Sequence, residues 1–583
     1  MIKFSIQLLF LLTTLTGLVG GSTLDLSFTH RYEGQLLRLG GIRYGKAQPH
    51  SVTRLSYLLS DFALQKQDGS WVSVAEQYLW IDLGARRTHG MLNDLPSGTY
   101  RAIRFSLGVP KAQNHGDPAQ WPAEHALNPN LNQLHWNWSG GYIFLALEGL
   151  YRGDDQQLKG FVYHLANDDN LTKIEIPAKF ELRQAARLDL GFDLARLLAG
   201  TRPLDFVKDG DSSHSAPGDP IASALCANLT GSFSLEAIKY PQGEAPLAPV
   251  KPLYLPETFT PYRFTMSARF PRPQLPRDNP LLEERVALGK QLFFDPRLSS
   301  NKQISCASCH QADKVFSDPR PLSRGVEDRL GARHSMPLFN LAWKSSFFWD
   351  GRAASLREQV LQPIQDHQEM ASDLPSLLND INADQDYSRA FDKAFGEGPA
   401  TSEKLALALE NYLLTLTSYD SKFDRAMAGK VELNELESRG MELFFTEYEP
   451  RSGKRGADCF HCHGGANFSD HRFHNNGLAP DSDLGRFAAT RQEVDKYLFS
   501  TPSLRNVAQS APYMHDGRFA TLEQVIAHYS GPMHRSETLD PNLAKHPKAG
   551  LKLTQGEQAA LVAFLKTLSD PKFGTSLGEH GEK

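Results

Sequence analysis

The chain has 583 residues, and 62 lysines and arginines against 67 aspartates and glutamates give a formal net charge of −5. This length predicts several domains, and a hydrophobic content of 40% with 10% aromatic residues fits globular cores rather than disorder. The slightly acidic balance excludes the electrostatic footprint of a general nucleic-acid binder, and five cysteines in so long a chain cannot form a disulfide framework.

Residues 1–22 are typical of a secretory signal. Lys3 supplies a positive start, the run from Phe4 to Val19 is mostly apolar, and the small residues Gly20-Gly21-Ser22 follow. An uncleaved anchor helix is the alternative, but the run is short and contains several polar residues. We therefore expect a periplasmic protein with no membrane span after the signal is removed.

Residues 23–236 have the pattern of an all-β, sandwich-like domain. The segment from Leu24 to Phe28 alternates apolar and polar residues, and turn signals such as Asp68-Gly69 separate such runs. Within this region, Leu188–Leu198 has helical spacing, and Pro220–Phe233 is compatible with a short helix.

Residues 237–277 are dense in proline and predict an extended linker. The rest of the chain favours helices, which we divide between 278–430 and 431–583. Glu283 and Glu284 fit the first turn of one helix, and Ser402–Leu416 forms another amphipathic segment. Residues 554–557 match a capping box that opens a helix reaching Leu568.

Each helical region contains one Cys-x-x-Cys-His motif. The motifs are Cys306, Cys309 and His310, and Cys459, Cys462 and His463. A single chance match in such a composition is expected on the order of a thousandth of a time. Two thiols at this spacing bind the two vinyl groups of one haem, and the histidine becomes the proximal iron ligand. A zinc ribbon would need the pairs much closer together, and thiol redox chemistry would need a nearby βαβ pattern. The motifs predict two covalent c-type haems in two cytochrome c-type domains.

Around these motifs, residues 278–570 resemble the bacterial di-haem cytochrome c peroxidase/MauG family. The segments that carry the resemblance are 288–295, 304–306, 348–352, 502–506 and 511–517. In that family the first haem reacts with peroxide, and the second stores or relays an electron. The resemblance implies that Trp349 passes charge between the haems. It also implies that Gln359, Pro363 and Glu369 line the peroxide pocket, where a carboxylate can move a proton.

The sixth ligand of the second haem divides this family between methionine and tyrosine. The family position corresponds to Tyr529, with Met514 and Met533 as nearby competitors. A tyrosine oxygen stabilises oxidised iron, which favours a MauG-like oxidase over peroxide detoxification.

A calcium ion between the haems is also implied by the resemblance, through the backbone carbonyls of Ser510 and Pro512. His334 stands where the family usually has asparagine, which puts this calcium in doubt. If His334 does not reach the first haem, that haem has an open coordination position.

Residues 23–236 resemble the MbnP/CorA family of exported copper-binding proteins. The carriers of the resemblance are the segments 55–61, 105–110, 114–118 and 135–142. In that family copper can be held by histidines and by kynurenine made from tryptophan. MbnP-type proteins are partnered by a MauG-like enzyme, MbnH, that makes this oxidation.

Imidazole suits copper, so histidines of this domain are candidate ligands, although a lone histidine is more often structural. The candidates are His30, His89, His115 and His135, followed by His125, His164 and His214. The candidate oxidised tryptophans are Trp121, Trp136 and Trp138, each of which could instead belong to the core. Cys226 fits a small buried residue, with a copper ligand as the alternative.

These patterns favour an MbnH-like oxidase, fused to an MbnP-like domain, that uses hydrogen peroxide to oxidise a tryptophan of its own N-terminal domain. One alternative is a cytochrome c peroxidase that takes electrons from a small cytochrome or cupredoxin. The other is a non-enzymatic copper-binding or electron-transfer protein.

Overall fold

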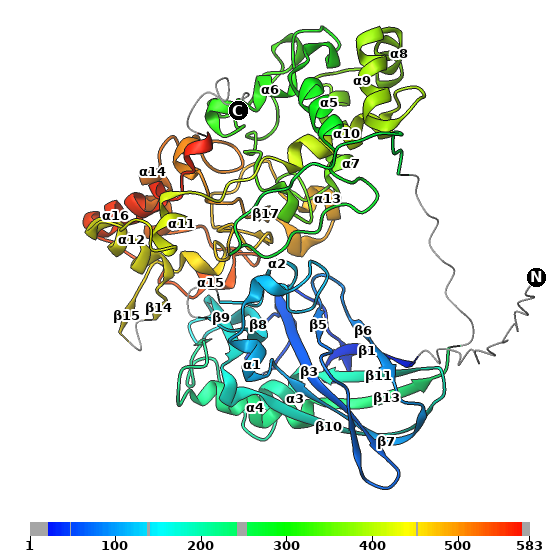
Figure 1. The fold of residues 1–583 in the computed structure, drawn as a ribbon. Helices are drawn as coiled ribbons and strands as arrows, with labels where there is room; N and C mark the ends of the chain where they lie inside the picture. The colour runs from blue at the N-terminus through cyan, green and yellow to red at the C-terminus, as the bar shows by residue number, and fades with distance from the viewer. Residues whose placement is uncertain (1–20, 47, 137–139, 242–252, 450–452, 574–583) are drawn as a thin grey trace, which may run out of the picture.

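The computed structural model describes residues 21–573 except 47, 137–139, 242–252 and 450–452 (Figure 1). The predicted signal therefore lies almost entirely outside the described residues. Within the described ranges, no helix has the length and apolar character needed to cross a membrane. As predicted, an N-terminal β domain is followed by a mainly helical half, and the two lie against each other in Figure 1.

In the described residues, the N-terminal domain consists of strands together with three short helices and one longer helix, α4 (Pro220–Ser232). The strands are β1 (Ser22–Tyr32), β2 (Gln35–Leu36), β3 (Arg54–Lys66), β4 (Trp71–Ser73), β5 (Leu79–Asp82), β6 (His89–Leu95), β7 (Gly98–Leu107), β8 (Ile143–Arg152), β9 (Leu158–Ala166), β10 (Thr172–Leu182), β11 (Ala185–Asp193), β12 (Ser212–Ser213) and β13 (Phe233–Lys239). The helices are α1 (Lys111–Asn114), α2 (Pro129–Asn132), α3 (Leu194–Ala199) and α4 (Pro220–Ser232).

Two sheets enclose one apolar core in this domain. One sheet has the strand order β13-β11-β1-β2 with β6 also on β1, and the other has the order β10-β7-β3-β8-β9-β12 with β4 and β5 on β3. The period-two pattern explains the packing, because Leu24, Leu26 and Phe28 of β1 are buried while their neighbours are only half-buried. Side chains of both sheets belong to the same core, as a sandwich requires.

The helix predicted over Leu188–Leu198 is wrong for its first half. β11 continues to Asp193, and α3 begins only at Leu194. The Asp193 carboxylate caps this helix by accepting a hydrogen bond from the Ala195 N–H. The residues Leu188, Leu190 and Phe192 alternate inward on a strand, so their apolar spacing does not belong to a helix. The helix expected after Pro220 is confirmed as α4.

The helical half contains twelve helices in the described residues. They are α5 (Glu283–Phe294), α6 (Cys306–Cys309), α7 (Leu356–Gln365), α8 (Leu374–Ala383), α9 (Gln385–Phe395), α10 (Ser402–Leu414), α11 (Lys422–Met427), α12 (Glu435–Phe445), α13 (Phe487–Thr490), α14 (Leu522–Ser530), α15 (Pro541–Ala544) and α16 (Gln555–Lys566). The described residues of this half also form two short antiparallel strand pairs, β14 (Tyr448–Glu449) with β15 (Lys454–Arg455) and β16 (Phe473–His474) with β17 (Phe499–Ser500).

The helical half has two apolar cores, one for each Cys-x-x-Cys-His motif. The first core is formed by residues between Phe270 and Leu416 together with Phe573, and the second by residues between Leu443 and Leu568. The predicted capping box at Thr554 is confirmed at the start of α16, with reciprocal bonds to Glu557.

The two cores use the same close helix contact. A Cβ at Gly289 of α5 would lie 2.0 Å from the Ala408 carbonyl oxygen of α10, and one at Gly440 of α12 would lie 1.9 Å from that of Ala560 in α16. Only glycine permits these approaches. The sequences after the two glycines, Lys-Gln-Leu-Phe-Phe and Met-Glu-Leu-Phe-Phe, are also alike, which supports a duplicated module.

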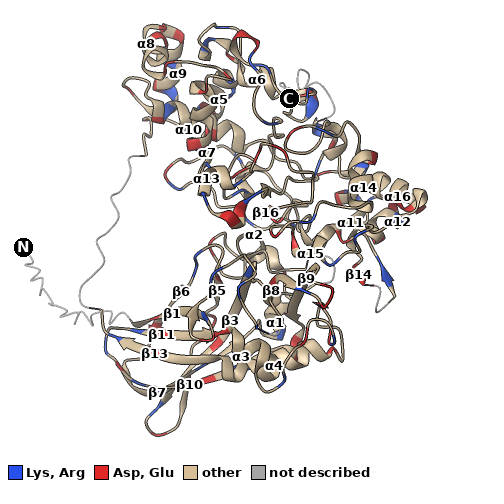
Figure 2. Ribbon diagram, turned by 180° about the vertical axis from the view of Figure 1, so that it is seen from behind, with Lys and Arg blue, Asp and Glu red and all other residues tan. Residues whose placement is uncertain are grey.

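The two halves of the chain meet where α15 lies against β8 and β9. Leu150 of the β domain shares a small apolar cluster with Leu539 and Ala544 of the helical half. A Cβ at Gly160 would lie 1.8 Å from the Pro541 carbonyl oxygen, so the two backbones are in direct contact. Figure 2 shows both signs of charge interspersed over the two halves.

Candidate active site

The first motif is arranged to hold a haem covalently. The helix α6 carries Cys306 and Cys309, and His310 follows as its C-cap. His310 Nδ1 lies 2.8 Å from the Phe316 carbonyl oxygen, which fixes the proton on Nδ1 and leaves a lone pair on Nε2. Burial lowers the pKa of His310, so the ring is neutral and able to ligate iron. Burial also raises the pKa of Cys306 to about 12, which argues against an activated thiolate.

The second motif repeats this chemistry. Cys459 and His461 lie on a short 3-10 helix, η8 (Cys459–His461), and His463 Nδ1 lies 3.2 Å from the Phe468 carbonyl oxygen. Burial lowers the pKa of His463 to about 4 and raises that of Cys459 to about 12. Both motifs therefore offer two thiols and one neutral, oriented imidazole, a donor set that fits a c-type haem.

The predicted peroxide-pocket residues lie together on α7 and in the loop after it. Gln359 and Pro363 are half-buried on the helix, and Glu369 lies beyond its C-terminus. Burial, assisted by the charge of Asp366, raises the pKa of Glu369 to about 7. The Glu369 charge acts in turn on both cysteines of the first motif, which places the carboxyl group beside that motif. Near neutral pH this group can both accept and return a proton.

Trp349 is fixed between the two helical units. Its side chain is buried, and Nε1 donates to the His334 carbonyl oxygen at 2.8 Å. The Trp349 carbonyl oxygen accepts from the Ser500 N–H of the second unit at 2.7 Å, and the His334 N–H donates to the His515 carbonyl oxygen at 2.8 Å. The bond to His334 therefore fixes the indole within the first unit, and the two backbone bonds tie Trp349 and His334 to the second unit.

His334 is held by its own local contacts. Its Nε2 is 3.3 Å from Ser317 Oγ, and its Nδ1 is 3.1 Å from the Pro321 carbonyl oxygen. These partners occupy both ring nitrogens, which is consistent with an open position at the first haem. The calcium prediction at Ser510 and Pro512 stays a prediction, and His334 offers it no amide oxygen.

Tyr529 of α14 lies in the pocket of the second motif. Its hydroxyl group is 3.3 Å from Asn476 Nδ2, and the same nitrogen is 3.5 Å from Met514 Sδ. Burial raises the pKa of Tyr529, and the charges of Cys459 and Cys462 act in the same direction. Ligation of iron by the phenolate therefore stays a prediction, with Met514 as a neighbouring competitor. Met533 packs beside Gly477.

The four histidines first expected to bind copper are not brought together. His30 of β1 is buried with Nε2 3.0 Å from the Tyr57 hydroxyl group, whereas His115 is exposed and 3.1 Å from the Asp168 carboxylate. His89 lies exposed on β6, and His135 packs its ring edge against Tyr142. Within the described residues, none of these four belongs to a group of close metal-ligating atoms.

Two histidines from the second group of candidates do meet. β12 pairs in parallel with β9, with Ser213 opposite Tyr163, so the next residues along, His214 and His164, become neighbours. Their ring centroids are 5.0 Å apart, and the Trp136 ring lies 6.3 Å from His164 and 5.9 Å from His214.

Sequence reasoning missed a third histidine at this place, His461 of the second haem motif. Its ring centroid is 5.3 Å from that of His214 and 6.1 Å from that of His164. One ligand atom from each of these three histidines lies within 4.8 Å of the others. The available signal was the histidine between the two motif cysteines, but nothing local reveals which surface that residue faces.

A buried charged network supports His461 from the helical side. His461 Nε2 lies 3.0 Å from a Glu447 carboxylate oxygen, and Lys545 bonds to the same carboxylate. Lys545 Nζ is also 3.1 Å from Asp458, whose carboxylate is 2.7 Å from His546 Nε2. The network fixes the His461 ring at the boundary between the two halves.

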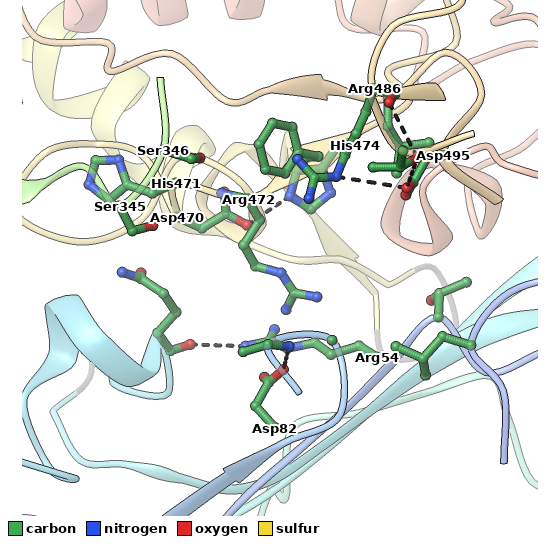
Figure 3. Close-up of a pocket in the computed structure, with 18 of the residues that line it drawn as sticks. Arg54, Asp82, Ser345, Ser346, Asp470, His471, Arg472, His474, Arg486 and Asp495 are labelled. Atoms are coloured by element: carbon green, nitrogen blue, oxygen red, sulfur yellow. Dashed lines mark hydrogen bonds and ion pairs between the residues drawn. The ribbon is translucent and has the colours of Figure 1, made fainter. Parts of the chain in front are cut away.

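A cleft of about 1530 Å³ also separates the two halves (Figure 3). Arg54 projects into it from the β domain, opposite Arg472 and His474 of the helical half. His474 is bonded to Asp470 at 2.8 Å and to Asp540 at 2.5 Å. Although burial alone would lower it, these two carboxylates raise the pKa of His474 to about 10, so this residue carries a positive charge.

The remaining candidates lie elsewhere or outside the described residues. Trp121 stacks on His125 with ring centroids 4.2 Å apart and packs against the core of the β domain. Trp138 lies outside the described residues. Cys226 packs on the sandwich core and donates to the Asn170 side-chain oxygen at 3.4 Å, which fits a structural role.

The comparisons with known proteins divide the chain in the same way. A family model described as di-haem cytochrome c peroxidase matches residues 283–432, and the MbnP model matches residues 21–215. The methylamine utilization protein MauG of Methylophilus methylotrophus is 37% identical over 306 residues, which cover 52% of this chain and 88% of that protein. The cytochrome c551 peroxidase of Pseudomonas aeruginosa is 33% identical over 304 residues, or 50% of this chain and 81% of that protein. The solved structure of a MauG-like protein associated with microbial copper homeostasis aligns with a TM-score of 0.48 and 33% identity, over 54% of this chain and 98% of that one.

Proposed function

Because the chain belongs to the di-haem cytochrome c peroxidase and MauG family, we propose that it uses hydrogen peroxide to oxidise Trp136 of its own MbnP-like domain toward kynurenine. The observation that carries this proposal is the position of Trp136. Its ring lies 5.9 Å from His214, which lies 5.3 Å from His461, the residue between the two cysteines of the second haem motif. A single imidazole ring thus lies between Trp136 and a residue of the second haem motif, which supports oxidation of Trp136 within one chain.

The chain's own residues have separate tasks in this reaction. When bound, the two haems supply the electrons that reduce peroxide and keep the resulting oxidising equivalents at the site. Glu369, with a pKa of about 7, takes a proton from peroxide and returns it to the leaving oxygen. Gln359 and Pro363 line the same pocket from α7. Trp349, held by its bonds to His334 and Ser500, passes charge between the two helical units.

The overall change at Trp136 balances with peroxide as the only oxidant. Two molecules of hydrogen peroxide add two oxygen atoms to the indole, open its five-membered ring to N-formylkynurenine, and leave two molecules of water. The tryptophan loses four electrons and the two peroxides gain them. Hydrolysis of the formyl group then releases formate and gives kynurenine.

Trp136 is a better substrate candidate than Trp121. Trp121 is stacked on His125 and packed beside Tyr78, so its contacts lie within the β domain. Trp136 lines a cavity of about 70 Å³ together with His164 and residues of the second haem motif, Phe460 and His461. We place the reaction in the periplasm because residues 1–22 resemble a secretory signal.

Copper binding by the N-terminal half is part of the proposed function. Support comes from His164 Nδ1 and His214 Nε2, which are buried and have no hydrogen-bond partner among the described residues. Neutral imidazoles are suitable ligands for copper.

Peptide mass spectrometry tests the oxidation. The haem-loaded protein is treated with hydrogen peroxide, and the peptide containing Trp136 should gain two oxygen atoms and then lose its formyl group. Trp136→Phe should abolish the change, whereas Trp121→Phe, the matched control, should leave it as in the unsubstituted protein. An unchanged Trp136 peptide in protein with both haems attached would refute the proposal.

A second candidate function is peroxide reduction with electrons from a small cytochrome or cupredoxin. Asn476 Nδ2 contacts both Met514 Sδ and the Tyr529 hydroxyl group, so a methionine lies beside the residue expected to ligate the second haem. This position of Met514 supports the second candidate function. A methionine–haem absorption signature, together with catalytic turnover of a reduced cytochrome, would support it.

A further inference from the structure

We propose that His164 and His214 of the β domain and His461 of the second haem motif form one copper site shared between the two halves of the chain. This deepens the proposed copper binding of the N-terminal half, on which it rests, but it does not depend on oxidation of Trp136. It assigns a ligand from the di-haem half, and from within a haem-attachment motif, to the metal site.

The first support is the pair of unsatisfied imidazole nitrogens. His164 Nδ1 and His214 Nε2 are buried without a hydrogen-bond partner within the described residues. An unsatisfied polar atom in the protein interior destabilises the fold. A metal ion that accepts both lone pairs removes this cost. Since one ligand atom from each of the three histidines lies within 4.8 Å of the others, one ion can contact all three after small side-chain shifts.

The second support is an outer shell on both sides of the site. His164 Nε2 is 3.0 Å from Glu148 Oε1, and Glu148 is held by Arg54 at 2.8 Å. A carboxylate that accepts the other ring N–H orients a metal-ligating histidine and raises its basicity. Glu447 does the same from the helical half, since it bonds to His461 Nε2. The same carboxylate lies 3.6 Å from His214 Nε2, on the metal-facing side of that ring, so it orients His461 but not His214.

The third support is charge. On the helical side of the site, the buried carboxylates of Glu447 and Asp458 outnumber the single ammonium group of Lys545 by one negative charge, whereas Glu148 on the β side is paired with Arg54. A monovalent cation neutralises this charge. Three imidazoles suit a borderline-soft ion, and together with this charge they match Cu(I). The carboxylates of Glu447 and Asp458 also lie close to His461, so they define the far side of the site.

The location has a structural consequence. When Cys459 and Cys462 hold a haem, the position of His461 between them is fixed in the helical half. If the two halves separate, His461 therefore moves away from His164 and His214. An ion bound by all three histidines therefore holds the halves together and keeps Trp136 at the second haem motif. Metal affinity and contact between the halves should change together.

The test is a Cu(I) titration of the full-length, haem-loaded protein in competition with a chromophoric Cu(I) chelator. We expect one tightly bound copper per chain. His164→Gln, His214→Gln and His461→Gln should each weaken binding at least about tenfold. His546→Gln is the matched control, because His546 belongs to the same buried network but lies outside the three-histidine group. It should bind copper within about twofold of the unsubstituted protein.

Haem spectra of His461→Gln verify that both haems are attached, since the residues between the motif cysteines do not bond to haem. Copper affinity unchanged in His461→Gln but lowered in the other two variants would overturn the shared site and confine copper to the β domain. Equal affinity in all variants would overturn the site altogether. Peptide mass spectra of the same samples report Trp136 oxidation separately, so failure of the copper site and failure of the proposed oxidation are distinguishable.

Discussion

Glu369→Gln tests the proton-transfer step most directly. Burial moves the Glu369 pKa from 4.5 to about 7, so about one tenth of the side chain is ionised at pH 6 and about nine tenths at pH 8. If the carboxylate accepts the peroxide proton, the rate of reaction with peroxide should rise about tenfold per pH unit below pH 7 and level off above it. The amide cannot accept this proton, so the variant should be slower by about 10²–10⁴-fold at pH 8.

The same shift has a consequence for stability. Because the folded-state pKa is raised above the unfolded value, the stability associated with this group is present below about pH 4.5 and is lost as the pH rises through 7. The full shift corresponds to about 3 kcal/mol. Glu369→Gln should therefore become more stable than the unsubstituted protein at pH 8, by up to that amount, in denaturant unfolding followed by haem absorbance.

Stopped-flow measurement of the peroxide reaction between pH 5 and 9 provides the assay. Asp366→Asn is the control, since removal of this neighbouring negative charge should move the inflection to lower pH and leave the plateau rate unchanged. A pH inflection near 7 that survives in Glu369→Gln would refute the assignment.

Three further predictions follow from close contacts and from the second haem pocket. In Gly160→Ala the new Cβ would lie 1.8 Å from a carbonyl oxygen of the helical half, so the two halves should separate. Oxidation of Trp136 should then become slower, while the reaction with peroxide keeps its rate. Equal rates of Trp136 oxidation in the two proteins would contradict this contact. Gly289→Ala and Gly440→Ala should each destabilise the helical half by about 1–3 kcal/mol in calorimetry, whereas Gly556→Ala, with no atom within 4 Å of its Cβ, should not. Tyr529→Phe should raise the reduction potential of the second haem in a redox titration if the phenol oxygen ligates iron, and an unchanged potential would exclude that ligand.

The sequence could predict those features that are encoded locally. The helix α16 begins after the capping box of Thr554, and the sequence predicts it because the box needs only two residues three positions apart. The two haem motifs are also local, and both imidazoles are oriented as their spacing requires. The helix predicted over Leu188–Leu198 is wrong in its first half because a buried strand followed directly by a helix gives mixed apolar spacing.

The site between the two halves could not be predicted in this way. His164 and His214 become neighbours only through the parallel pairing of β9 with β12, a contact between segments far apart in the chain. His461 joins them only because α15 docks against β8 and β9 and turns the second haem motif toward the β domain. The presence of histidines and the family resemblance predict copper chemistry. Which histidines come together depends on the strand register and on the contact between the two halves.

The contact between the halves also predicts that each molecule oxidises its own tryptophan. Because Trp136 and the haem domains belong to one chain, oxidation of Trp136 is intramolecular, and its rate should not depend on protein concentration. Mixing two variants separates the two routes. Glu369→Gln retains Trp136 but reacts poorly with peroxide, whereas Trp136→Phe reacts with peroxide but has no substrate side chain. In the mixture, oxidation within one chain leaves Trp136 unmodified, and oxidation between chains restores its conversion. Because Gly160 and Pro541 are in backbone contact and His461 lies beside His214, we expect the mixture to behave like Glu369→Gln alone, and restored conversion would show that the halves exchange between molecules.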